Sequence, residues 1–412
     1  MANFSKKATG TTKDGTRFEV IEQLGSGGQG IVYKVKINCT EKALKWYNAK
    51  QSEDKGLHER IEKMCLEDAP SDKFVWPLEF VDRDSDGQFG YIMDIFPSDF
   101  ESFSKYLNGR VSPKSYEALT KMAINLAEAF DALHSKGYSY QDLNDGNIVL
   151  NMTTGDILLC DNDNVVANQE QSGILGKARY LAPEMVTGTK KYPDKQTDRY
   201  SLSVLLFMLF TKSHPLEGER VLKAPCLTEA ASKKLYGSDA LFIFDPKDDS
   251  NRPNKRIHRG VISAWPELPK YIQDRFIEAF SQELLSGKKN RISSDSWKKD
   301  FNKMLNSIYN GDKFFDPSDL KVVKHYIDID NGLTIIPLIK GKTVKAIDIN
   351  EKGDEVYGVV LEKNGRFGLG NKSKEIWQAT LGGKQKIIKP KEVLPIQTGV
   401  VLKIKSIKLE FK

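Results

Sequence analysis

The stretch YSYQDLNDGNIVL, residues 138–150, places charged and amide side chains directly before an apolar run. Asp142 and Asn147 lie five residues apart in it. Asn, Asp and Gly are frequent turn formers, so a plain surface turn is one interpretation. The other is a loop whose carboxylate and amide serve chemistry. The rest of the chain has to decide between them.

A glycine-rich segment occurs in RFEVIEQLGSGGQGIVYKVKI, residues 17–37. Gly25, Gly27 and Gly30 follow a G-x-G-x-x-G pattern, which lets the backbone approach a phosphate and present its N–H groups. The pattern alone is weak, because a β-hairpin without a ligand can have the same sequence. A dinucleotide-binding fingerprint would need a helix after the glycines, but the strand-like GIVYKVKI follows. The arrangement favours a nucleotide covered by strand, loop and strand.

Lys45 lies in KALKWY, residues 42–47, which has the pattern of a short strand. A strand lysine usually faces solvent. The neighbours Ala43, Leu44 and Trp46 instead predict a buried strand, in which a cationic tip needs anionic partners.

The helical pattern of GLHERIEKMCLEDA, residues 56–69, offers a carboxylate for Lys45. Glu62 lies next to the apolar stripe of this helix and is the preferred partner, with Glu59 as the second choice. Two solvent-exposed helix charges are the alternative. The stripe consists of Leu57, Ile61, Met64 and Cys65.

With these parts in order, residues 15–309 resemble a eukaryotic-like protein kinase. The segment YQDLNDGN (140–147) stands where the family has H-R-D-L-x-x-x-N, and LLCDNDNV (158–165) stands at the place of D-F-G. YIMDIF (91–96) matches the hinge. Further matches are Ala182-Pro183-Glu184 as the A-P-E motif, Asp198 as the buried aspartate of the central helix, and Arg291 as the partner of Glu184.

The resemblance implies a bilobal fold that binds ATP and Mg²⁺ and transfers a phosphoryl group to a protein hydroxyl, of Ser/Thr rather than Tyr type. It implies that Lys45, held by Glu62, contacts phosphates. Asp161 and Asn147 would hold Mg²⁺, and Asp142 would accept or orient the proton of the attacking hydroxyl. The residues implied to contact the nucleotide also include Gly25, Gly27, Gly30, Val32, Ala43, Met93 and Asp94.

Four positions around the two central motifs depart from the family pattern. Tyr140 and Gln141 replace His and Arg, so the guanidinium that pairs with a phosphorylated activation loop is missing. Asn162 and Asp163 replace the Phe and Gly of D-F-G, which adds a second carboxylate near the metal. We therefore expect activity that does not depend on loop phosphorylation.

Two further departures concern the acceptor. Ser/Thr kinases commonly carry a Lys two positions after the catalytic Asp and a Thr before the A-P-E motif. Here those positions hold Asn144 and Lys177, so acceptor specificity does not carry over from the family. Two hypotheses stay open: an active kinase, and a pseudokinase scaffold that binds nucleotide or a partner protein without transfer.

Charge and composition divide the chain. Residues 331–412 carry a net charge of +8, which leaves −2 for residues 1–330. The tail consists of short β-branched runs between Gly, Asn and Lys turns, which predicts a small all-β unit. The expected fold class is therefore α+β. The expected order is a flexible N-terminus (1–14), a kinase N-lobe (15–96), a kinase C-lobe (97–309), a linker (310–329) and a C-terminal β domain (330–412).

The tail segment LPIQTGVVLKIKSIKLEF (394–411) resembles the last strands of a forkhead-associated domain, a phosphothreonine-binding sandwich. The phosphate-reading S-R-x-H segment is not visible, so we expect a degenerate sandwich that packs on the kinase or binds a partner. Nucleic-acid binding is disfavoured, because Trp377 and Phe367 are too few aromatic residues for a stacking platform.

The segments FVWPLEF (74–80), HPLEG (214–218) and LFIFDPKDDSNRP (241–253) resemble those of a bacterial kinase branch often encoded beside a protein phosphatase and a von Willebrand A-like protein. Either protein is an expected partner, besides the protein substrate.

The length of 412 residues and the 39% hydrophobic content are typical of a soluble globular protein. The longest apolar run, VLLFMLF (204–210), is too short to span a bilayer, and MANFSKKATG at the start lacks a signal-peptide segment. We expect a cytoplasmic protein. The four cysteines are widely spaced without a C-x-x-C pair, which argues against a zinc ribbon and a disulfide framework.

Overall fold

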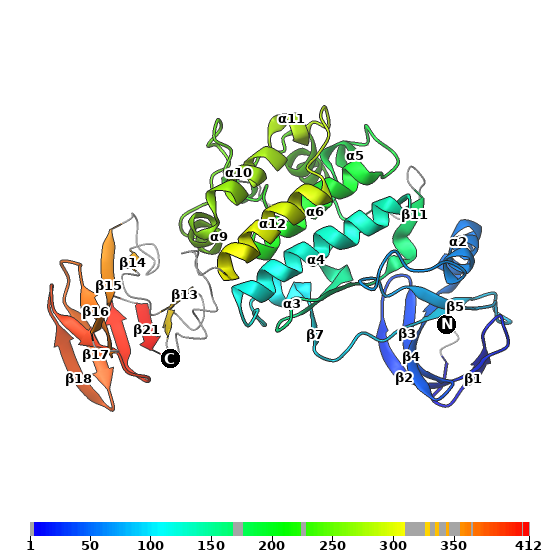
Figure 1. The fold of residues 1–412 in the computed structure, drawn as a ribbon, viewed down its shortest axis with the longest axis horizontal. Helices are drawn as coiled ribbons and strands as arrows, with labels where there is room; N and C mark the ends of the chain where they lie inside the picture. The colour runs from blue at the N-terminus through cyan, green and yellow to red at the C-terminus, as the bar shows by residue number, and fades with distance from the viewer. Residues whose placement is uncertain are drawn as a thin grey trace.

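The computed structural model describes residues 4–167, 176–223, 228–309, 326–329, 334–337, 343–345, 355–363, 366–405 and 407–411. Figure 1 shows a β-sheet with helix α2 in the N-terminal part, a group of helices in the middle and a second β-rich part at the C-terminal end. This order of three zones agrees with the prediction.

The N-terminal part contains an antiparallel sheet in the order β1-β2-β3-β4-β6-β5. The alternating burial of β2 and β3 places Val20 and Val35 in one core with Leu44, and β4 is buried on both faces over residues 43–47. The strands are β1 (Thr9–Thr11), β2 (Arg17–Ser26), β3 (Gly30–Ile37), β4 (Thr40–Tyr47), β5 (Pro77–Val81) and β6 (Gly90–Met93).

The prediction of a flexible N-terminus over residues 1–14 is wrong for the described part of that segment. Strand β1 pairs with β2, with Thr9 opposite Glu19. The ring of Phe4 packs edge-on against Trp46, with 5.0 Å between the ring centroids. A short β-strand and one aromatic anchor therefore attach this segment to the sheet.

Helix α2 (Lys55–Cys65) follows the short helix α1 (Ala49–Ser52) and lies beside the sheet (Figure 1). Its N-cap is Asp54, whose carboxylate accepts a hydrogen bond from the backbone N–H of Leu57. Leu57, Ile61 and Met64 are buried, as the helical spacing predicts, and this burial sets which helix face points away from the core.

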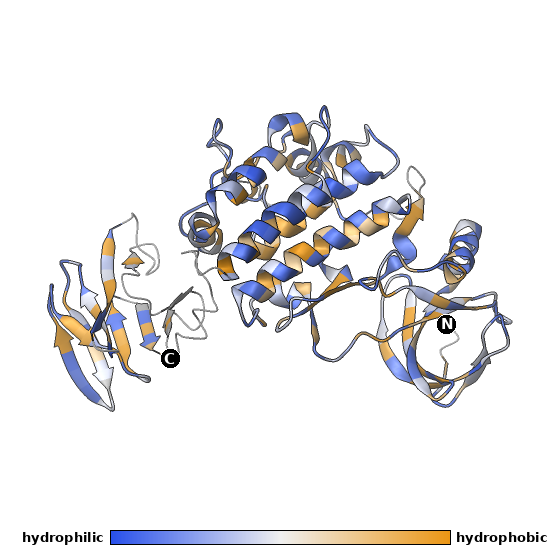
Figure 2. Cartoon of the chain, viewed as in Figure 1, coloured by the Kyte–Doolittle hydropathy of each residue, from blue (hydrophilic) through white to orange (hydrophobic). Residues whose placement is uncertain are grey.

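The middle part is built on three long helices. Helix α6 (Lys195–Thr211) is buried along almost its whole length, which explains its uniformly apolar run. Helix α4 (Tyr116–Ser135) lies beside α12 (Ser294–Tyr309) in Figure 1 and is rich in hydrophobic residues in Figure 2. Shorter helices complete this part: α3 (Phe103–Leu107), α5 (Pro183–Thr187), α7 (Glu219–Leu222), α8 (Glu229–Lys233), α9 (Arg259–Ala264), α10 (Lys270–Ala279) and α11 (Gln282–Leu285).

Five short strands, β7 to β11, flank the loops between residues 100 and 167. Strand β9 lies between β10 and β7, and β11 pairs with β8. The 3₁₀ turn Asp145–Asn147 leads directly into β9, and the 3₁₀ turn Asn162–Asn164 lies between β10 and β11. The strands are β7 (Phe100–Ser102), β8 (Tyr138–Tyr140), β9 (Ile148–Asn151), β10 (Ile157–Leu159) and β11 (Val165–Ala167).

The C-terminal part has two antiparallel sheets, in the orders β13-β12-β21-β20-β17-β18 and β14-β15-β16-β19. Trp377 on the first and Val360 on the second are both fully buried in one core, in agreement with a sandwich-like unit. The strands are β12 (Tyr326–Ile329), β13 (Thr334–Pro337), β14 (Thr343–Lys345), β15 (Val356–Lys363), β16 (Arg366–Asn371), β17 (Trp377–Leu381), β18 (Lys384–Ile388), β19 (Val393–Pro395), β20 (Val401–Ile404) and β21 (Ile407–Phe411).

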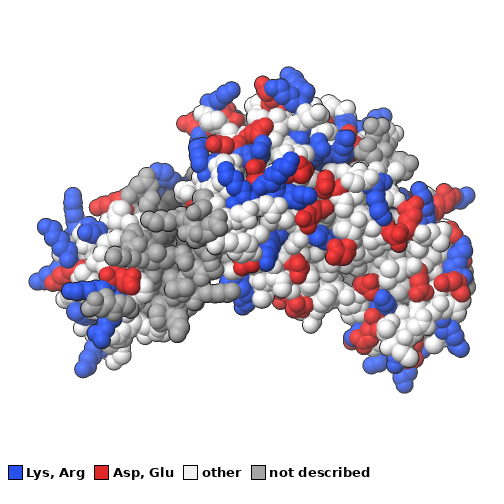
Figure 3. All heavy atoms as spheres, in the orientation of Figure 1, with Lys and Arg blue, Asp and Glu red and all other residues white. Residues whose placement is uncertain are grey.

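Strand β12 begins four residues before the predicted start of the β domain at 330, and residues 310–325 of the predicted linker lie outside the described residues. Figure 3 shows Lys and Arg side chains at the outer edge of this C-terminal part. Among the helices of the described residues, none is long and apolar enough to cross a membrane.

Candidate active site

The loop that carries Asp142 and Asn147 is a tight turn closed by amide side chains. Asn144 and Asn147 both donate through Nδ2 to the carbonyl oxygen of Asp142, at 3.0 and 2.8 Å. Asn144 also caps the 3₁₀ turn, since its Oδ1 accepts from the N–H of Gly146 at 2.9 Å. The two interpretations of this stretch are therefore compatible, because the turn formers fix the Asp142 backbone. The donor group of Asn147 is engaged, which leaves its Oδ1 for another ligand.

A second turn places Asp161 beside this loop. Asp161 has left-handed backbone angles (φ 53°, ψ 45°), and its side chain is 46% exposed. The N–H of the preceding Cys160 donates to the carbonyl of Asn147 at 2.8 Å. The hydroxyl of Tyr140 lies 3.2 Å from the carbonyl oxygen of Asp161 and also contacts that of Cys160. The side chains of Asp161 and Asn147 thus belong to two turns that are hydrogen-bonded to each other.

Helix α6 binds the backbone just before the Asp142 loop through Asp198. Asp198 is buried, as predicted, and its Oδ2 accepts from the N–H of Tyr140 at 3.0 Å. The Nε2 atom of His134 lies 3.0 Å from the same oxygen. Burial raises the pKa of Asp198, while His134 opposes that shift. The buried aspartate thus fixes the backbone two residues before Asp142.

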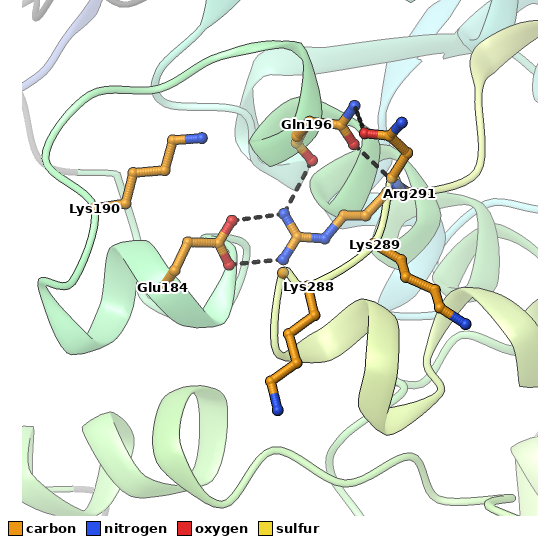
Figure 4. A pocket seen from close by; sticks show the side chains of 8 residues that line it. Glu184, Lys190, Gln196, Lys288, Lys289 and Arg291 are labelled. Carbon is orange, nitrogen blue, oxygen red and sulfur yellow. Dashed lines mark hydrogen bonds and ion pairs between the residues drawn. The ribbon is translucent and has the colours of Figure 1, made fainter.

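The predicted pair of Glu184 and Arg291 is confirmed. The Arg291 guanidinium donates Nη1 and Nη2 to the two Glu184 carboxylate oxygens at 2.7 and 2.6 Å (Figure 4). Arg291 also donates to the carbonyl of Gln196 at 3.1 Å and is almost fully buried. This bidentate pair joins α5 to the start of α6 and to the segment before α12.

Lys45 is buried, but the prediction that Glu62 holds it is wrong. In the described part of the chain, Lys45 Nζ is bonded to Asp163 Oδ2 at 2.7 Å, to Gln29 Oε1 at 2.8 Å and to Asp161 Oδ1 at 3.5 Å. Glu62 instead pairs with Lys13, and its side chain is 32% exposed. The apolar stripe of α2 faces the core, and Glu62 contacts the turn between β1 and β2. Glu59, the second choice, is exposed.

Asp163 is the partner that sequence reasoning missed. Its side chain is fully buried and accepts from the hydroxyl of Tyr47 at 2.6 Å as well as from Lys45. The expectation of a second carboxylate near the metal stays a prediction, and in the structure this carboxylate bonds to the strand lysine. The sequence contained one signal for a shared partner. Lys45 and Tyr47 are two residues apart on β4, so their side chains lie on the same face and can donate to the same carboxylate.

The charges in this cluster support one another. Burial lowers the pKa of Lys45, but Asp163 and Asp161 outweigh it and raise the pKa above its usual value, so the ammonium stays charged. Burial and the neighbouring Asp163 hold the pKa of Tyr47 well above its usual value, which keeps its hydroxyl a donor. Asp142 has a raised pKa because it is partly buried, and Lys177 opposes that shift.

The glycines that were predicted to contact the nucleotide lie at the ends of β2 and β3 and in the loop between these strands. No atom lies within 4 Å of a Cβ built on Gly25 or Gly27, whereas a Cβ on Gly30 would lie 2.0 Å from the carbonyl oxygen of Trp46. Gly30 is thus required by the close approach of β4, and the loop with Gly25 and Gly27 has open space beside it.

Two pairs of predicted residues lie opposite each other in the register of the sheet. Val32 is opposite Lys45, and Ala43 is opposite Met93 at the end of β6. Asp94, the next hinge residue, is exposed and pairs with Lys42 on β4. The strand, loop and strand pattern is therefore confirmed, with the hinge beside Ala43.

Residues 18–305 match the family model described as "Protein kinase domain". The chain belongs to the protein kinase family. It is 24% identical over 216 residues to a probable serine/threonine-protein kinase of Clostridium perfringens, covering 50% of this chain and 30% of the relative. It is 30% identical over 229 residues to the serine/threonine-protein kinase PknF of Mycobacterium tuberculosis, covering 51% of this chain and 45% of PknF.

The solved structures include the kinase domain of Mycobacterium tuberculosis PknI, with 20% identity and a TM-score of 0.46 over 73% of this chain and 99% of that chain. The chain spans less than half the length of the two curated relatives that it matches.

Proposed function

We propose that this chain is an ATP-dependent protein kinase that phosphorylates a protein hydroxyl, of Ser/Thr type. The observation that carries the proposal is the single hydrogen-bonded unit formed by the turns of Asp142, Asn147 and Asp161, next to the buried cation of Lys45. The two curated relatives described above are named serine/threonine-protein kinases.

The residues present fit Mg²⁺ and ATP. Asp161 offers an exposed carboxylate, and Asn147 has its donor group bonded to the backbone, so both can turn oxygen atoms to a hard cation. The open loop of Gly25 and Gly27 and the charged Lys45 suit phosphates. When bound, ATP and Mg²⁺ supply the transferable phosphoryl group and neutralise its charge.

The residues of the chain position and deprotonate the acceptor. Asp142, held through its carbonyl by Asn144 and Asn147, orients the substrate hydroxyl and accepts its proton. Lys45 contacts the phosphates of the nucleotide. Gln29, which now bonds Lys45, is the loop residue that a phosphate would replace.

The competing hypothesis of a pseudokinase scaffold rested on Tyr140, Gln141 and Asn162. The contacts of two of these residues support transfer instead. Tyr140 bridges to the Asp161 turn through its hydroxyl, and Asn162 is buried and donates to the carbonyls of Val75 and Leu159 at 2.8 and 2.9 Å. These departures from the family thus supply hydrogen bonds that hold both turns.

Two measurements test the proposal. Mg·ATP at millimolar concentration should raise the thermal midpoint, since a ligand of the folded state stabilises it. Labelled phosphate from γ-labelled ATP should appear on protein hydroxyls. A raised midpoint without transfer would support the scaffold, and an unchanged midpoint would contradict both functions.

We also propose that residues 15–309 form the kinase and that the C-terminal β unit is a degenerate forkhead-associated domain that binds a partner protein in the cytoplasm, such as a cognate protein phosphatase or a von Willebrand A-like protein. The shared core of its two sheets supports a sandwich. A panel of phosphothreonine peptides tests the domain type. We expect no binding, because the phosphate-reading segment is missing.

A further inference from the structure

The Lys45 ammonium is surrounded by groups that no kinase pattern in the sequence indicates. Its shortest contact is to the Asp163 carboxylate at 2.7 Å, and the hydroxyl of Tyr47 donates to the same carboxylate oxygen at 2.6 Å. We propose that Asp163 is the positioning residue that holds Lys45 for the nucleotide, in the place expected for Glu62. This inference rests on the proposed function in one respect, the binding of nucleotide at Lys45.

Burial makes this pair indispensable to the lysine. The side chains of Lys45 and Asp163 are 5% and 0% exposed, so each charge depends on the other for compensation. Tyr47 fixes the direction of the carboxylate, because it donates from the same face of β4 as Lys45. The third donor position of Lys45 faces Asp161 at 3.5 Å. The lysine is therefore anchored to the turn that carries Asp161.

The role of helix α2 changes accordingly. Arg60 donates through Nε to the backbone carbonyl of Asp163 at 3.3 Å, and this is the contact that the helix makes with the turn side of the pair. Glu62 pairs with Lys13, and neither residue is among the hydrogen-bond partners of Lys45 in the described part of the chain. The placement of Lys45 thus follows the Asp161–Asp163 turn, and the carboxylates of α2 do not set it.

A double-mutant cycle on nucleotide affinity tests this role. ADP without magnesium is titrated into wild type, Asp163→Asn, Lys45→Met and the double variant, with circular dichroism as the check of folding. We expect Asp163→Asn to weaken ADP binding at least tenfold in the wild-type background and less than twofold in the Lys45→Met background. Glu62→Gln is the matched control and should leave the affinity unchanged.

Equal effects of Asp163→Asn in both backgrounds, or a tenfold effect of Glu62→Gln, would overturn the proposal, as would a wild type that binds no ADP. If Asp163→Asn does not fold, Tyr47→Phe replaces it in the cycle with an expected effect of two- to fivefold that again disappears with Lys45→Met. A cycle with this result in a protein that transfers no phosphate would leave the positioning role intact and contradict only the kinase function.

A second inference comes from the activation segment. Lys177 Nζ donates to Asn144 Oδ1 at 2.9 Å, and a Cβ on the adjacent Gly176 would lie 3.5 Å from Asp142 Oδ1. In the described part of the chain, Lys177 forms no ion pair, so a neutral amide holds its charge beside Asp142. We infer that Lys177 contacts the phosphoryl group during transfer.

No covalent bond of Lys177 forms or breaks during the transfer. The bond from the γ-phosphorus to its bridging oxygen breaks, a bond to the substrate hydroxyl oxygen forms, and the hydroxyl proton passes to Asp142. Lys177 exchanges its hydrogen bond to Asn144 for hydrogen bonds to the oxygens of the transferring group, whose charge the ammonium stabilises. The family has its lysine in the catalytic loop, at the position of Asn144. In this chain the lysine is at position 177 instead.

The exchange itself provides the test. Lys177→Thr should lower kcat at least tenfold with ADP affinity unchanged within twofold, and the double variant Asn144→Lys/Lys177→Thr should recover most of the lost rate. Lys270→Thr, an exposed lysine on α10, is the control with unchanged kcat. A normal kcat for Lys177→Thr, an equal loss of ADP affinity, or no recovery in the double variant would overturn the inference.

Discussion

The hydroxyl of Tyr140 lies 3.2 Å from the carbonyl oxygen of Asp161, so one side chain of the Asp142 loop reaches the turn of the metal-ligand candidate. Tyr140 is also fixed from behind, because its N–H donates to Asp198. The Tyr140 side chain therefore connects the two turns by a hydrogen bond.

Removal of that hydroxyl should loosen the connection between the turns. We expect Tyr140→Phe to lower the free energy of unfolding by about 1–2 kcal/mol, since a buried hydrogen bond is lost, and to lower kcat by about tenfold. Denaturant unfolding and initial rates measure the two effects. An unchanged kcat would show that the bridge has no part in transfer.

Asn162 occupies the position of the family's phenylalanine. It is buried and donates to the carbonyls of Val75 and Leu159, so an apolar side chain there would leave the Val75 carbonyl without this donor. We expect Asn162→Phe, the change toward the family pattern, to lower the free energy of unfolding by about 2–4 kcal/mol. Equal or greater stability of this variant in urea would contradict our account of the turn.

Activity should not depend on phosphorylation of the activation segment. Ser172 lies outside the described residues, but the two cations near it in the sequence are engaged elsewhere. Lys177 binds Asn144, and Arg179 forms a bidentate pair with Glu217 at 2.6 and 2.9 Å. We expect Ser172→Ala and phosphatase-treated wild type to keep the initial rate of untreated protein. A loss of tenfold, about 1.4 kcal/mol in the barrier, would contradict this.

Glu217 should make stability dependent on acid pH. Burial raises the pKa of Glu217, but His214 and Arg179 outweigh it and lower the pKa to about 2, from an ordinary value of 4.5. The stability that this carboxylate contributes is therefore complete above pH 4.5 and is lost as the pH falls toward 2. Burial also lowers the pKa of His214 to about 4, so protonation of this residue adds to the loss below its ordinary value of 6.5.

We expect Glu217→Gln to lower the free energy of unfolding at pH 7 by about 2 kcal/mol, because the partly buried ion pair with Arg179 loses one charge. Urea unfolding at pH 7, 5 and 3.5 measures the difference from wild type, which should shrink at the lowest pH. A difference that stays constant over this range would show that the carboxylate charge is not responsible.

Local motifs were predictable from the sequence. Gly27, Asp142 and Asn147 depend on short-range turn chemistry, and their spacing identifies the loops that carry them. The pair of Glu184 and Arg291 followed from the family resemblance, and the structure confirms it. Burial of Leu57, Ile61 and Met64 followed from helical spacing.

The partner of Lys45 was not predictable in the same way. Asp163 is 118 positions away in sequence, and the choice between it and Glu62 depends on how α2 is rotated and on where the turn after β10 ends. Helical spacing predicts which face of α2 is buried. It does not predict which residues contact the side chains next to that face. Glu62 contacts Lys13, which lies in the turn between β1 and β2, in a segment that was expected to be a flexible tail.

The most direct test of phosphoryl transfer compares wild type with Asp142→Asn in γ-labelled ATP and Mg²⁺, with a mixture of generic proteins as acceptors. The variant keeps the backbone carbonyl that Asn144 and Asn147 bind, so the fold and ADP affinity should be unchanged. We predict labelled Ser and Thr with wild type and a rate at least a hundredfold lower with Asp142→Asn. No labelling by wild type, or equal labelling by both proteins, would contradict the proposed kinase function.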